Sequence, residues 1–582
     1  MIRITQLKLR VNEPREKLVS SVRKALRLKE DEAFCITVLR RSIDARKKPD
    51  LYEVYTVLVR FENPCTERRI LRSHLKNISE YEPVRYRYSL PEDAGILRAR
   101  ADEAFPVSQH EKEPDRPVII GTGPAGLFCG LLLAREGLRP ILIERGRRVP
   151  ERSKSVQSFW KGGHLDPDSN VQFGEGGAGT FSDGKLNTGV KDPEGRIRFV
   201  LETFVQAGAL EEILTDAKPH IGTDMLRNVV SSLSDEITSR GADMFFETCM
   251  ERITRGDNGT WQVFCSRKKD SERDGDERET IRFSTRNLVL AVGHSARDTF
   301  RMLHDGGILM RPKAFAVGVR IQHPQDVIDR AMYGDPFGYS LPAASYKLTH
   351  RLSDGRGVYS FCMCPGGYVV NASSEEGCLA VNGMSSHDRA SGSANSAIVV
   401  TVSPKEILEF TKRNISEKPD AGNGGNTLND DVLIGVEFQR QLERASFEAG
   451  NGSIPVQCFR DFTSSPASCS GLRMPDYEPR IRGRWTPASI RQIFPEKICL
   501  GIEEGILAWE RQIKGFSSPD AILCACESRT SSPVRIERGE DFQALGHPGL
   551  YPCGEGAGYA GGITSAAVDG LKVAEQILKL YK

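Results

Sequence analysis

The side chains that could carry out chemistry are spread over a few short segments of the sequence. Lys185 follows Ser182 and Asp183, and its ammonium group could stabilise negative charge on a reacting group; a phosphate contact or a surface salt bridge is the alternative. Cys364 ends the pair Cys362-Met-Cys364, which lacks the C-x-x-C spacing of redox and metal sites, so packing is the alternative role. Lys185 and Cys364 are therefore the candidate catalytic residues.

Other ionisable residues could transfer a proton or bind an anion. His294 follows a glycine and could be an acid or a base, with a hydrogen-bonded loop histidine as the alternative. Arg529 and Arg535 could receive an anionic substrate, or they could be solvated or ion-paired. The sequence contains no zinc-ligand spacing, no Walker loop and no Ser-His-Asp order, so it predicts no metal site.

A glycine fingerprint opens the first long α/β segment. Gly121, Gly123 and Gly126 fit G-x-G-x-x-G, follow the apolar residues 118–120 and begin a helix. Such glycines allow a tight turn, a close approach to a pyrophosphate and close helix–strand packing, and the helix N-terminus offers free N–H groups. Glu144 ends the next strand and could bind a ribose 2′-hydroxyl, which favours FAD or NAD. The residues expected to contact the cofactor here are Gly121, Gly123, Pro124, Ala125, Gly126, Glu144 and Arg145.

Two later segments favour FAD over NAD. Residues 284–298 form an apolar strand that ends in Ala291-Val-Gly293 and resembles the return strand of two-dinucleotide-domain flavoproteins. Residues 550–578 predict a strand, a glycine loop and a helix. In glutathione-reductase-like flavoproteins an acidic residue, usually Asp, holds the ribityl chain after such a strand, and the helix N-terminus faces the flavin N1/O2 edge. The residues expected to contact the cofactor here are Ala291, Gly293, Gly554, Glu555, Gly562, Ile563 and Thr564.

The stretch 171–186 contains five glycines in sixteen residues. So many glycines indicate tight turns or a close approach to another group. We expect backbone N–H groups of this stretch to face the pyrophosphate and the flavin ring, with Gly177, Ala178, Gly179 and Lys185 in contact with the cofactor. A flexible surface loop is the alternative.

Several motifs together resemble one family. They are "EGGAGTFSDGKL" (175–186), "PHIGTD" (219–224), "FCMCPGGYVVNASSEEG" (361–377), "VNGMSSHDR" (381–389), "ESRTSSPVRI" (527–536) and the C-terminal "GEGAGYAGGI". They resemble the large FAD-dependent dehydrogenase-like proteins of bacteria and plastids, which are related to the HI0933-like flavoproteins. The resemblance covers essentially the whole chain and implies bound FAD, with no implied substrate. It also implies that Met250 meets the adenine and that the turn Gly366-Gly367 approaches the flavin face.

These segments require an α/β fold with a Rossmann-like FAD-binding domain of the glutathione-reductase type. We expect an N-terminal α+β domain over residues 1–112. The FAD-binding domain is expected over residues 113–300 and 535–582. An inserted α+β substrate or cap domain is expected over residues 301–534.

Composition bounds the remaining possibilities. Of 582 residues, 39% are hydrophobic and 27% charged, and the net charge is +2, so no global field favours nucleic acid or a membrane. Residues 1–100, however, hold 23 Lys and Arg against 14 Asp and Glu. The sequence has no signal-peptide pattern and no apolar run long enough to span a bilayer. Its 14 cysteines are scattered along the chain. These features favour the cytoplasm, with an organellar stroma or matrix as the alternative.

The sequence therefore predicts an FAD-dependent oxidoreductase that transfers a hydride between flavin and a small organic substrate. Without a second nicotinamide-binding unit, NADH or NADPH would be a transient electron donor, or electrons would come from the substrate. The rival hypothesis is an FAD-containing factor that binds or modifies RNA or protein through its basic N-terminal domain, near Arg40, Arg41, Arg46, Lys47 and Lys48.

Overall fold

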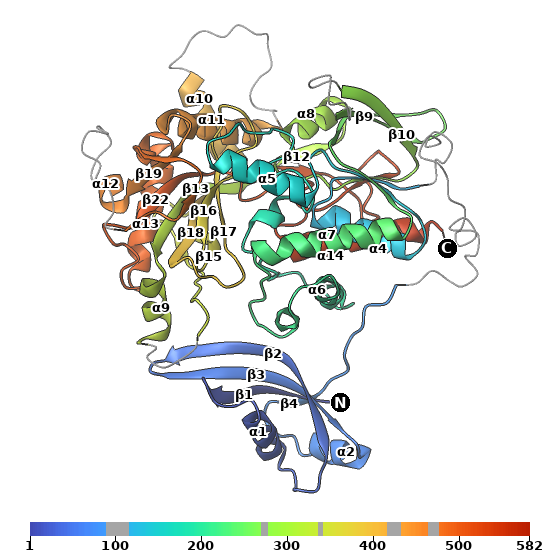
Figure 1. The fold of residues 1–582 in the computed structure, drawn as a ribbon, viewed down its shortest axis with the longest axis vertical. Helices are drawn as coiled ribbons and strands as arrows, with labels where there is room; N and C mark the ends of the chain where they lie inside the picture. Colours follow the sequence, from blue (N-terminus) through green and yellow to red (C-terminus); the bar gives the residue numbers. More distant parts are fainter. Residues whose placement is uncertain (89–115, 269–277, 336–340, 416–431, 464–476, 582) are drawn as a thin grey trace.

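A computed structural model of the chain describes residues 1–88, 116–268, 278–335, 341–415, 432–463 and 477–581. The N-terminal unit lies at one end of the molecule (blue in Figure 1). Its four antiparallel strands run in the order β2-β3-β1-β4, the βαββαβ topology of ferredoxin-like domains, with helices α1 and α2 on one face. Its elements are β1 (Ile2–Arg10), α1 (Lys17–Leu26), β2 (Phe34–Lys47), β3 (Asp50–Phe61), α2 (Pro64–Arg72) and β4 (Ile78–Glu80).

The FAD-binding unit is built on a parallel five-stranded sheet in the order β24-β11-β5-β6-β7. Four of these strands, β5, β6, β11 and β24, are fully buried because helices pack against one face of the sheet and an antiparallel meander of strands packs against the other. An antiparallel meander, β8-β9-β10, connects β7 to β11. The strands are β5 (Val118–Ile120), β6 (Ile141–Ile143), β7 (Asp243–Phe245), β8 (Thr248–Arg255), β9 (Trp261–Lys268), β10 (Arg278–Thr285), β11 (Leu288–Leu290) and β24 (Leu550–Pro552).

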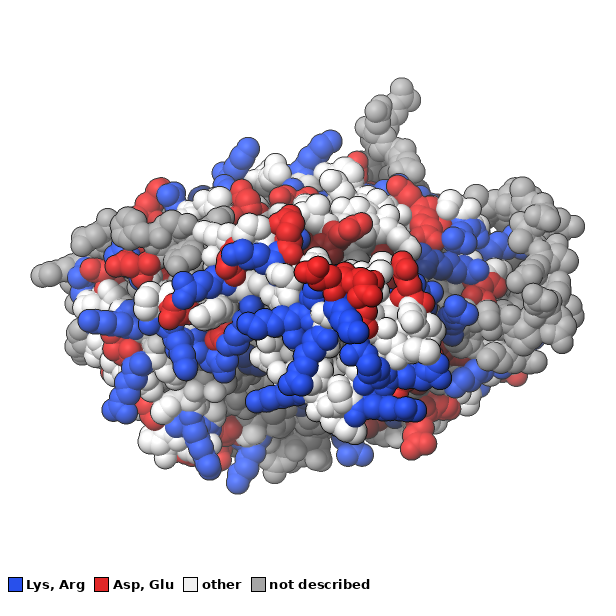
Figure 2. Space-filling model, turned by 90° about the horizontal axis from the view of Figure 1, so that it is seen from below, with Lys and Arg blue, Asp and Glu red and all other residues white. Residues whose placement is uncertain are grey.

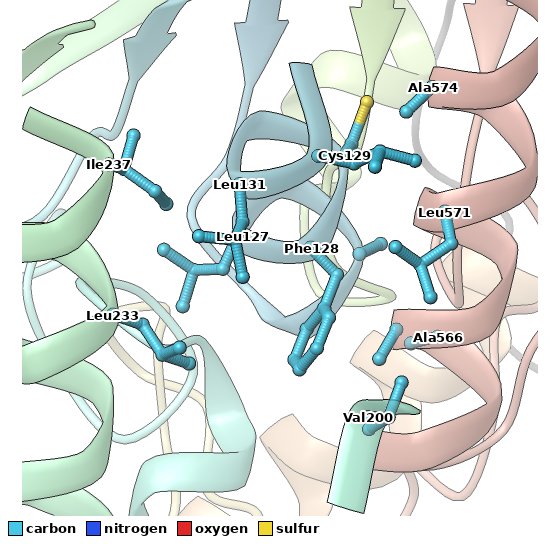
Figure 3. Packing of buried hydrophobic residues seen from close by; sticks show 14 of the residues in the cluster. Leu127, Phe128, Cys129, Leu131, Val200, Leu233, Ile237, Ala566, Leu571 and Ala574 are labelled. Atoms are coloured by element: carbon cyan, nitrogen blue, oxygen red, sulfur yellow. The ribbon is translucent and has the colours of Figure 1, made fainter. Parts of the chain in front are cut away.

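Helix α4 is the centre of this unit and is apolar on nearly every side. Figure 3 shows Phe128 on one side of the helix toward Ala566 and Leu571 of α14, and Leu127 on the other side toward Leu233 of α7. The helix is therefore buried between the sheet and two neighbouring helices, which fixes its N-terminus firmly. The helices are α4 (Pro124–Arg135), α5 (Val149–Trp160), α6 (Arg196–Gln206), α7 (Thr223–Ser239), α8 (Arg297–Asp305) and α14 (Ile563–Lys579), with 3-10 turns η2 (Ala178–Phe181) and η3 (Glu211–Leu214).

The cap unit contains a seven-stranded sheet, β14-β15-β18-β13-β22-β19-β21, and a smaller sheet, β17-β16-β20. It joins the FAD-binding unit through the antiparallel pair β12 and β23. Its strands are β12 (Met310–Pro312), β13 (Phe315–Pro324), β14 (Thr349–Arg351), β15 (Gly357–Cys364), β16 (Tyr368–Asn371), β17 (Val381–Met384), β18 (Ser393–Val402), β19 (Ile454–Cys458), β20 (Ile481–Arg482), β21 (Trp485–Pro487), β22 (Ile522–Glu527) and β23 (Val534–Ile536). Its helices are α9 (Gln325–Tyr333), α10 (Pro404–Ile415), α11 (Ile434–Ala449), α12 (Phe459–Thr463) and α13 (Glu496–Trp509), with the 3-10 turn η4 (Ile490–Gln492).

The N-terminal unit is attached to the FAD-binding unit by specific contacts. The backbone N–H of Arg41 in β2 donates to the carbonyl of Thr215 at 2.7 Å, and its guanidinium lies 3.0 Å from the Asp216 carboxylate. The Tyr86 hydroxyl donates to Glu575 of α14 at 2.7 Å. These contacts hold one end of the N-terminal unit against the FAD-binding unit.

The predicted fold class is confirmed: a Rossmann-like parallel sheet carries the fingerprint, and further α+β units accompany it. The predicted boundary between residues 112 and 113 lies outside the described residues, and the domain limits stay predictions. Among the described residues, every helix is too short or too polar to cross a bilayer.

Candidate functional site

The fingerprint turn has the geometry that its glycines predict. Gly121 has φ +100°, and a Cβ there would lie 2.6 Å from the carbonyl oxygen of Ala291 at the end of β11. A Cβ at Gly126 would lie 1.9 Å from the Gly121 oxygen. Helix α4 begins after Gly123 with no side-chain cap, so its first N–H groups point out of the helix without a capping side chain. The turn is thus shaped to present backbone donors at the carboxyl edge of the sheet.

The glycine-rich stretch 171–186 packs against this turn. The N–H of Gly176 donates to the Thr122 oxygen at 2.9 Å, and a Cβ at Gly177 would lie 3.1 Å from the Cα of Gly123. The N–H groups of Gly174, Gly176, Gly177 and Gly184 all donate to acceptors within the protein. The expectation that these N–H groups face a cofactor is therefore corrected: the glycines let two backbone segments lie in contact. Cofactor contacts of Gly177, Ala178 and Gly179 stay predictions.

Glu144 organises this contact. One carboxylate oxygen accepts the N–H and hydroxyl of Thr122 at 2.9 and 2.8 Å. The other accepts the N–H groups of Gly146 and Gly174 at 3.1 and 3.0 Å. Four donors match the four acceptor sites of a carboxylate. The predicted bond to a ribose hydroxyl would therefore replace the Thr122 hydroxyl, which can rotate away, rather than occupy an empty position.

Arg145, predicted to contact the cofactor, and Met250, predicted to meet the adenine, are both packed against other protein groups. Nη2 of Arg145 donates to both carboxylate oxygens of Asp298, at 2.9 and 2.8 Å, and the guanidinium stacks over the Phe173 ring. Met250 is buried in β8, which starts beside the fingerprint because the N–H of Thr248 donates to the Glu144 oxygen. The backbone of β8 is thus adjacent to the predicted ribose position.

Helix α14 brings the C-terminal glycine loop to the same edge. Its N-terminus follows Gly562 without a side-chain cap, and the Thr564 hydroxyl donates to the Leu186 oxygen at 2.8 Å. Asp569 accepts the N–H of Gly554 at 2.8 Å and pairs with Arg538 through both carboxylate oxygens. Asp569 and Arg538 were not predicted from the sequence. A carboxylate within the apolar residues of a helix indicates a buried partner, and Asp569 could have been found by that signal. A Cβ at Gly293 or Gly562 would meet no atom within 4 Å, so space lies beside both.

The two candidate catalytic residues lie close to one another. Burial raises the pKa of the Cys364 thiol, while the positive charges of Lys185 and Arg320 act in the opposite direction. The Cys364 thiol is therefore neutral at physiological pH, which argues against a thiolate nucleophile at this position. Cys364 is buried and donates to the Cys362 carbonyl at 3.2 Å, whereas Cys362 is exposed.

The turn after Cys364 has a structural reason for its glycines. Gly366 has φ +50°, and a Cβ there would lie 1.5 Å from the Arg389 carbonyl oxygen. A Cβ at Gly367 would lie 2.5 Å from the Met384 oxygen. The two glycines thus let this turn lie against the backbone of the cap, and its expected approach to a flavin face stays a prediction.

The arginine predicted to receive an anion is already paired. Arg529 donates to both oxygens of Glu443 at 2.8 and 2.7 Å and also to Ser295 at 3.2 Å. Arg535 is exposed and stacks over the Tyr559 ring. Arg529 therefore joins the cap to the FAD-binding unit rather than facing a substrate.

Several of the basic N-terminal residues form ion pairs or hydrogen bonds with other residues of the chain. Arg41 pairs with Asp216, Arg46 pairs with Asp44 at 2.8 Å, and Lys48 donates to the Ala331 carbonyl. Figure 2 views the molecule from the N-terminal side, where Lys and Arg side chains gather with Asp and Glu beside them. Mixed charge of this kind is typical of a solvated or docking surface.

Comparisons with known proteins give the family. The model of an "FAD-dependent protein, C-terminal domain-like" family matches residues 314–530, and a domain of unknown function matches residues 1–60. A protein of Clostridium beijerinckii, described as uncharacterized, is 40% identical over 587 aligned residues that cover all of this chain and 99% of the relative. The chain belongs to the family of this clostridial protein.

Solved structures similar to this family member are distant. A flavoprotein/dehydrogenase from Cytophaga hutchinsonii is 10% identical with a TM-score of 0.33, covering 80% of this chain and 78% of that one. An E. coli quinol fumarate reductase is 13% identical with a TM-score of 0.31, covering 80% and 70%. The flavin-dependent halogenase CmlS is 14% identical with a TM-score of 0.26, covering 52% and 44%.

The residues present in this family member fit an FAD. The uncapped N-termini of α4 and α14 offer donors to phosphate and to the flavin edge. His294 Nε2 and Lys185 Nζ are buried and have no hydrogen-bond partner among the described residues. The Glu555 carboxylate lies 3.6 Å from His294 Nδ1, beyond hydrogen-bond distance. His294 directly follows Gly293, beside which space lies, so an unsatisfied polar group is available to a cofactor there.

The affinity for FAD is expected to rise with pH up to about 7. Burial raises the pKa of Glu555 to about 7, against the attraction of Lys313, so the carboxyl group is protonated below that pH. Ribityl hydroxyl groups would donate to the ionised form, so FAD binding would release a proton. Below pH 7 the dissociation constant should rise by up to about tenfold per pH unit. Fluorescence titration of the apoprotein with FAD between pH 5.5 and 8.5 measures this.

Glu555→Gln should bind FAD more weakly and remove this pH dependence. Glu540→Gln, at an exposed carboxyl group, is the matched control and should retain it. An unchanged affinity of the native chain across pH 6–8 would show that Glu555 does not meet the ribityl chain.

Proposed function

We propose that this chain is an FAD-dependent oxidoreductase that transfers a hydride between flavin and a small organic substrate. The family match and the Rossmann-like fold support an FAD-dependent oxidoreductase in general. The observation that carries the proposal is that the fingerprint turn and the uncapped N-terminus of α14 occur together with Lys185 Nζ and His294 Nε2, two buried polar atoms without a hydrogen-bond partner among the described residues.

A bound FAD would supply the two-electron chemistry. The chain's own residues would orient it and set the electrostatics around it. Thr564 holds the α14 N-terminus to the segment of Lys185, so a helix dipole and an ammonium group lie close together where negative charge is expected on reduction. Burial and the nearby Arg529 and Arg297 lower the pKa of His294 to about 3, so this ring is neutral and can donate or accept one hydrogen bond.

The electron donor and the compartment remain part of the proposal. NADH or NADPH would act as a transient donor, and the cytoplasm is the proposed compartment. The rival hypothesis of an RNA- or protein-binding factor has no supporting contact, because three of the basic residues that suggested it, Arg41, Arg46 and Lys48, bond within the chain.

An anaerobic absorbance spectrum of the purified protein, before and after addition of NADH and then NADPH, tests the proposal. We expect oxidised flavin bands that one nicotinamide bleaches. Bands that neither nicotinamide bleaches, but that fall with a substrate found in a metabolite screen, would support the oxidoreductase and exclude a nicotinamide donor. A colourless protein that cannot be reconstituted with FAD would overturn the proposal.

A further inference from the structure

Lys185 and Arg389 flank the Asp183 carboxylate where the FAD-binding unit meets the cap, and Lys218 lies on the neighbouring segment. Lys185 Nζ is buried, has no hydrogen-bond partner among the described residues and lies 3.7 Å from Asp183 Oδ2. This distance allows an ion pair but no hydrogen bond, so the three ammonium donors of Lys185 are unsatisfied. A buried ammonium group without an acceptor is costly unless a ligand supplies one.

The donors to Asp183 come from Arg389 and Ser385, and Lys185 stays at ion-pair distance from Oδ2 without a hydrogen bond. Arg389 donates to Oδ1 from Nε at 3.3 Å and to Oδ2 from Nη2 at 2.9 Å, and the Ser385 hydroxyl also donates to Oδ1. Asp183 is buried and Arg389 half-buried. The Asp183 carboxylate thus compensates the charge of Arg389, and the charge of Lys185 is left over.

Lys218 adds a third positive charge to the group. Its ammonium donates to Ser345 Oγ at 3.0 Å, and its side chain reaches the surface. The segment of Lys218 lies along that of Lys185, because the N–H of Leu186 donates to the Pro219 carbonyl at 3.0 Å. Partial burial lowers the pKa of Lys218, and the positive charges of Lys185 and Arg389 lower it further. Among the described residues, two of these three cations therefore have no matching carboxylate in the cluster.

The neighbouring histidines do not supply the missing negative charge. His220 stacks on His387, with ring centroids 5.2 Å apart, and burial together with Arg389 lowers the pKa of His220 to about 4. Glu212 and Asp224, the carboxylates beside this stack, contact His387: one lies 3.4 Å from its Nε2 and the other accepts its N–H at 2.8 Å. His220 is thus neutral, and the carboxylates of Glu212 and Asp224 interact with His387 rather than with the lysines.

The cluster lies at the reacting end of the site rather than at the phosphate end. Gly177 contacts the fingerprint turn, where a pyrophosphate is expected, whereas Leu186, next to Lys185, is bonded to Thr564 at the start of α14. On the cap side, Cys362 is exposed and lies within the electrostatic influence of Lys185. An anion bound by Lys185 would therefore lie between the cap and the flavin edge.

We propose that Lys185 and Lys218 bind the carboxylate of an organic acid substrate, and that Asp183 and Arg389 position Lys185 for this contact. This assignment rests on the proposed oxidoreductase function and names its substrate class. A carboxylate offers two acceptors to two ammonium groups and compensates the excess positive charge. The residues come from separate segments of the FAD-binding unit and the cap, so both units would contribute to substrate binding.

Difference spectroscopy of the flavin-loaded protein tests the assignment, with succinate, inorganic phosphate and chloride at matched ionic strength as probes. We expect succinate to shift the flavin bands saturably and chloride to have no such effect. Lys218→Met, at an exposed side chain, and Lys185→Met should each raise the apparent Kd for succinate at least tenfold. Lys405→Met, at an exposed lysine on α10, is the matched control and should leave that Kd unchanged.

A second measurement separates this proposal from the function itself. Succinate should also raise the thermal midpoint of the flavin-free protein, and Lys218→Met should abolish that increase. A protein that is reduced normally yet shows neither a spectral nor a thermal response to succinate would overturn the carboxylate site and leave the oxidoreductase intact. A response to phosphate but not to succinate would also overturn it, since the site would then suit a phosphate ester.

Discussion

Gly121→Ala is expected to yield a protein that no longer retains FAD. Gly121 has φ +100°, where side chains are strained, and a Cβ would lie 2.6 Å from the Ala291 oxygen of the neighbouring strand. Backbone strain alone costs about 1–3 kcal/mol. Because the same turn presents the phosphate-binding donors, we expect the Kd for FAD to rise by at least about ten- to a hundredfold. The ratio of flavin to protein absorbance after purification measures the loss.

Gly189→Ala is the matched control for this change. A Cβ at Gly189 would meet no atom within 4 Å, and its φ lies outside the left-handed region. We expect this variant to retain FAD as the native chain does. Circular dichroism of both variants would separate a local effect on the turn from a general failure to fold. Full retention of FAD by Gly121→Ala would contradict the assignment of the turn.

Glu443→Leu is expected to destabilise the junction between the cap and the FAD-binding unit by about 3–5 kcal/mol. The Glu443 carboxylate is fully buried in α11 and pairs with Arg297, the first residue of α8, and with Arg529, which follows β22. These two arginines hold the pKa of Glu443 well below its usual range. Removal of the carboxylate would leave two buried guanidinium groups without their main counter-charge.

Urea denaturation, followed by fluorescence of the buried Trp509 in the cap, measures this loss. Glu202→Gln provides the control, because Glu202 pairs with Arg198 at 2.7 Å on an exposed helix face. Solvated pairs contribute little, so the control should unfold at the native urea concentration. An equal midpoint for Glu443→Leu would mean that the network is replaceable by packing.

Local sequence patterns were sufficient for the parallel sheet and its fingerprint. The apolar run 118–120, the glycines after it and Glu144 at the end of the next strand are close in the sequence, and the geometry of a βαβ unit follows from such spacing. The glycine at 121 is explained by its φ, and the apolar helix after it by burial on every side. The cofactor class could be inferred because the residues of this fingerprint also lie close together in the sequence.

Roles that depend on distant partners could not be predicted in this way. The glycines of residues 174–184 indicated a close approach but not its target, which is the fingerprint turn itself. Arg529 was a candidate for anion binding until its partner Glu443, far away in the sequence, accounted for it. A side chain's type gives its possible charge and bonds, whereas its partners depend on tertiary packing.

The sequence by itself determined the α/β class, the FAD fingerprint and the two residues, Lys185 and Cys364, that deserved testing as catalytic groups. Tertiary structure alone decided that Lys185 lies beside Lys218 and Arg389, and that Asp183 is already committed to Arg389. The physical reason is that electrostatic interactions act through space over a few ångströms, and folding brings together charges that sequence spacing does not relate.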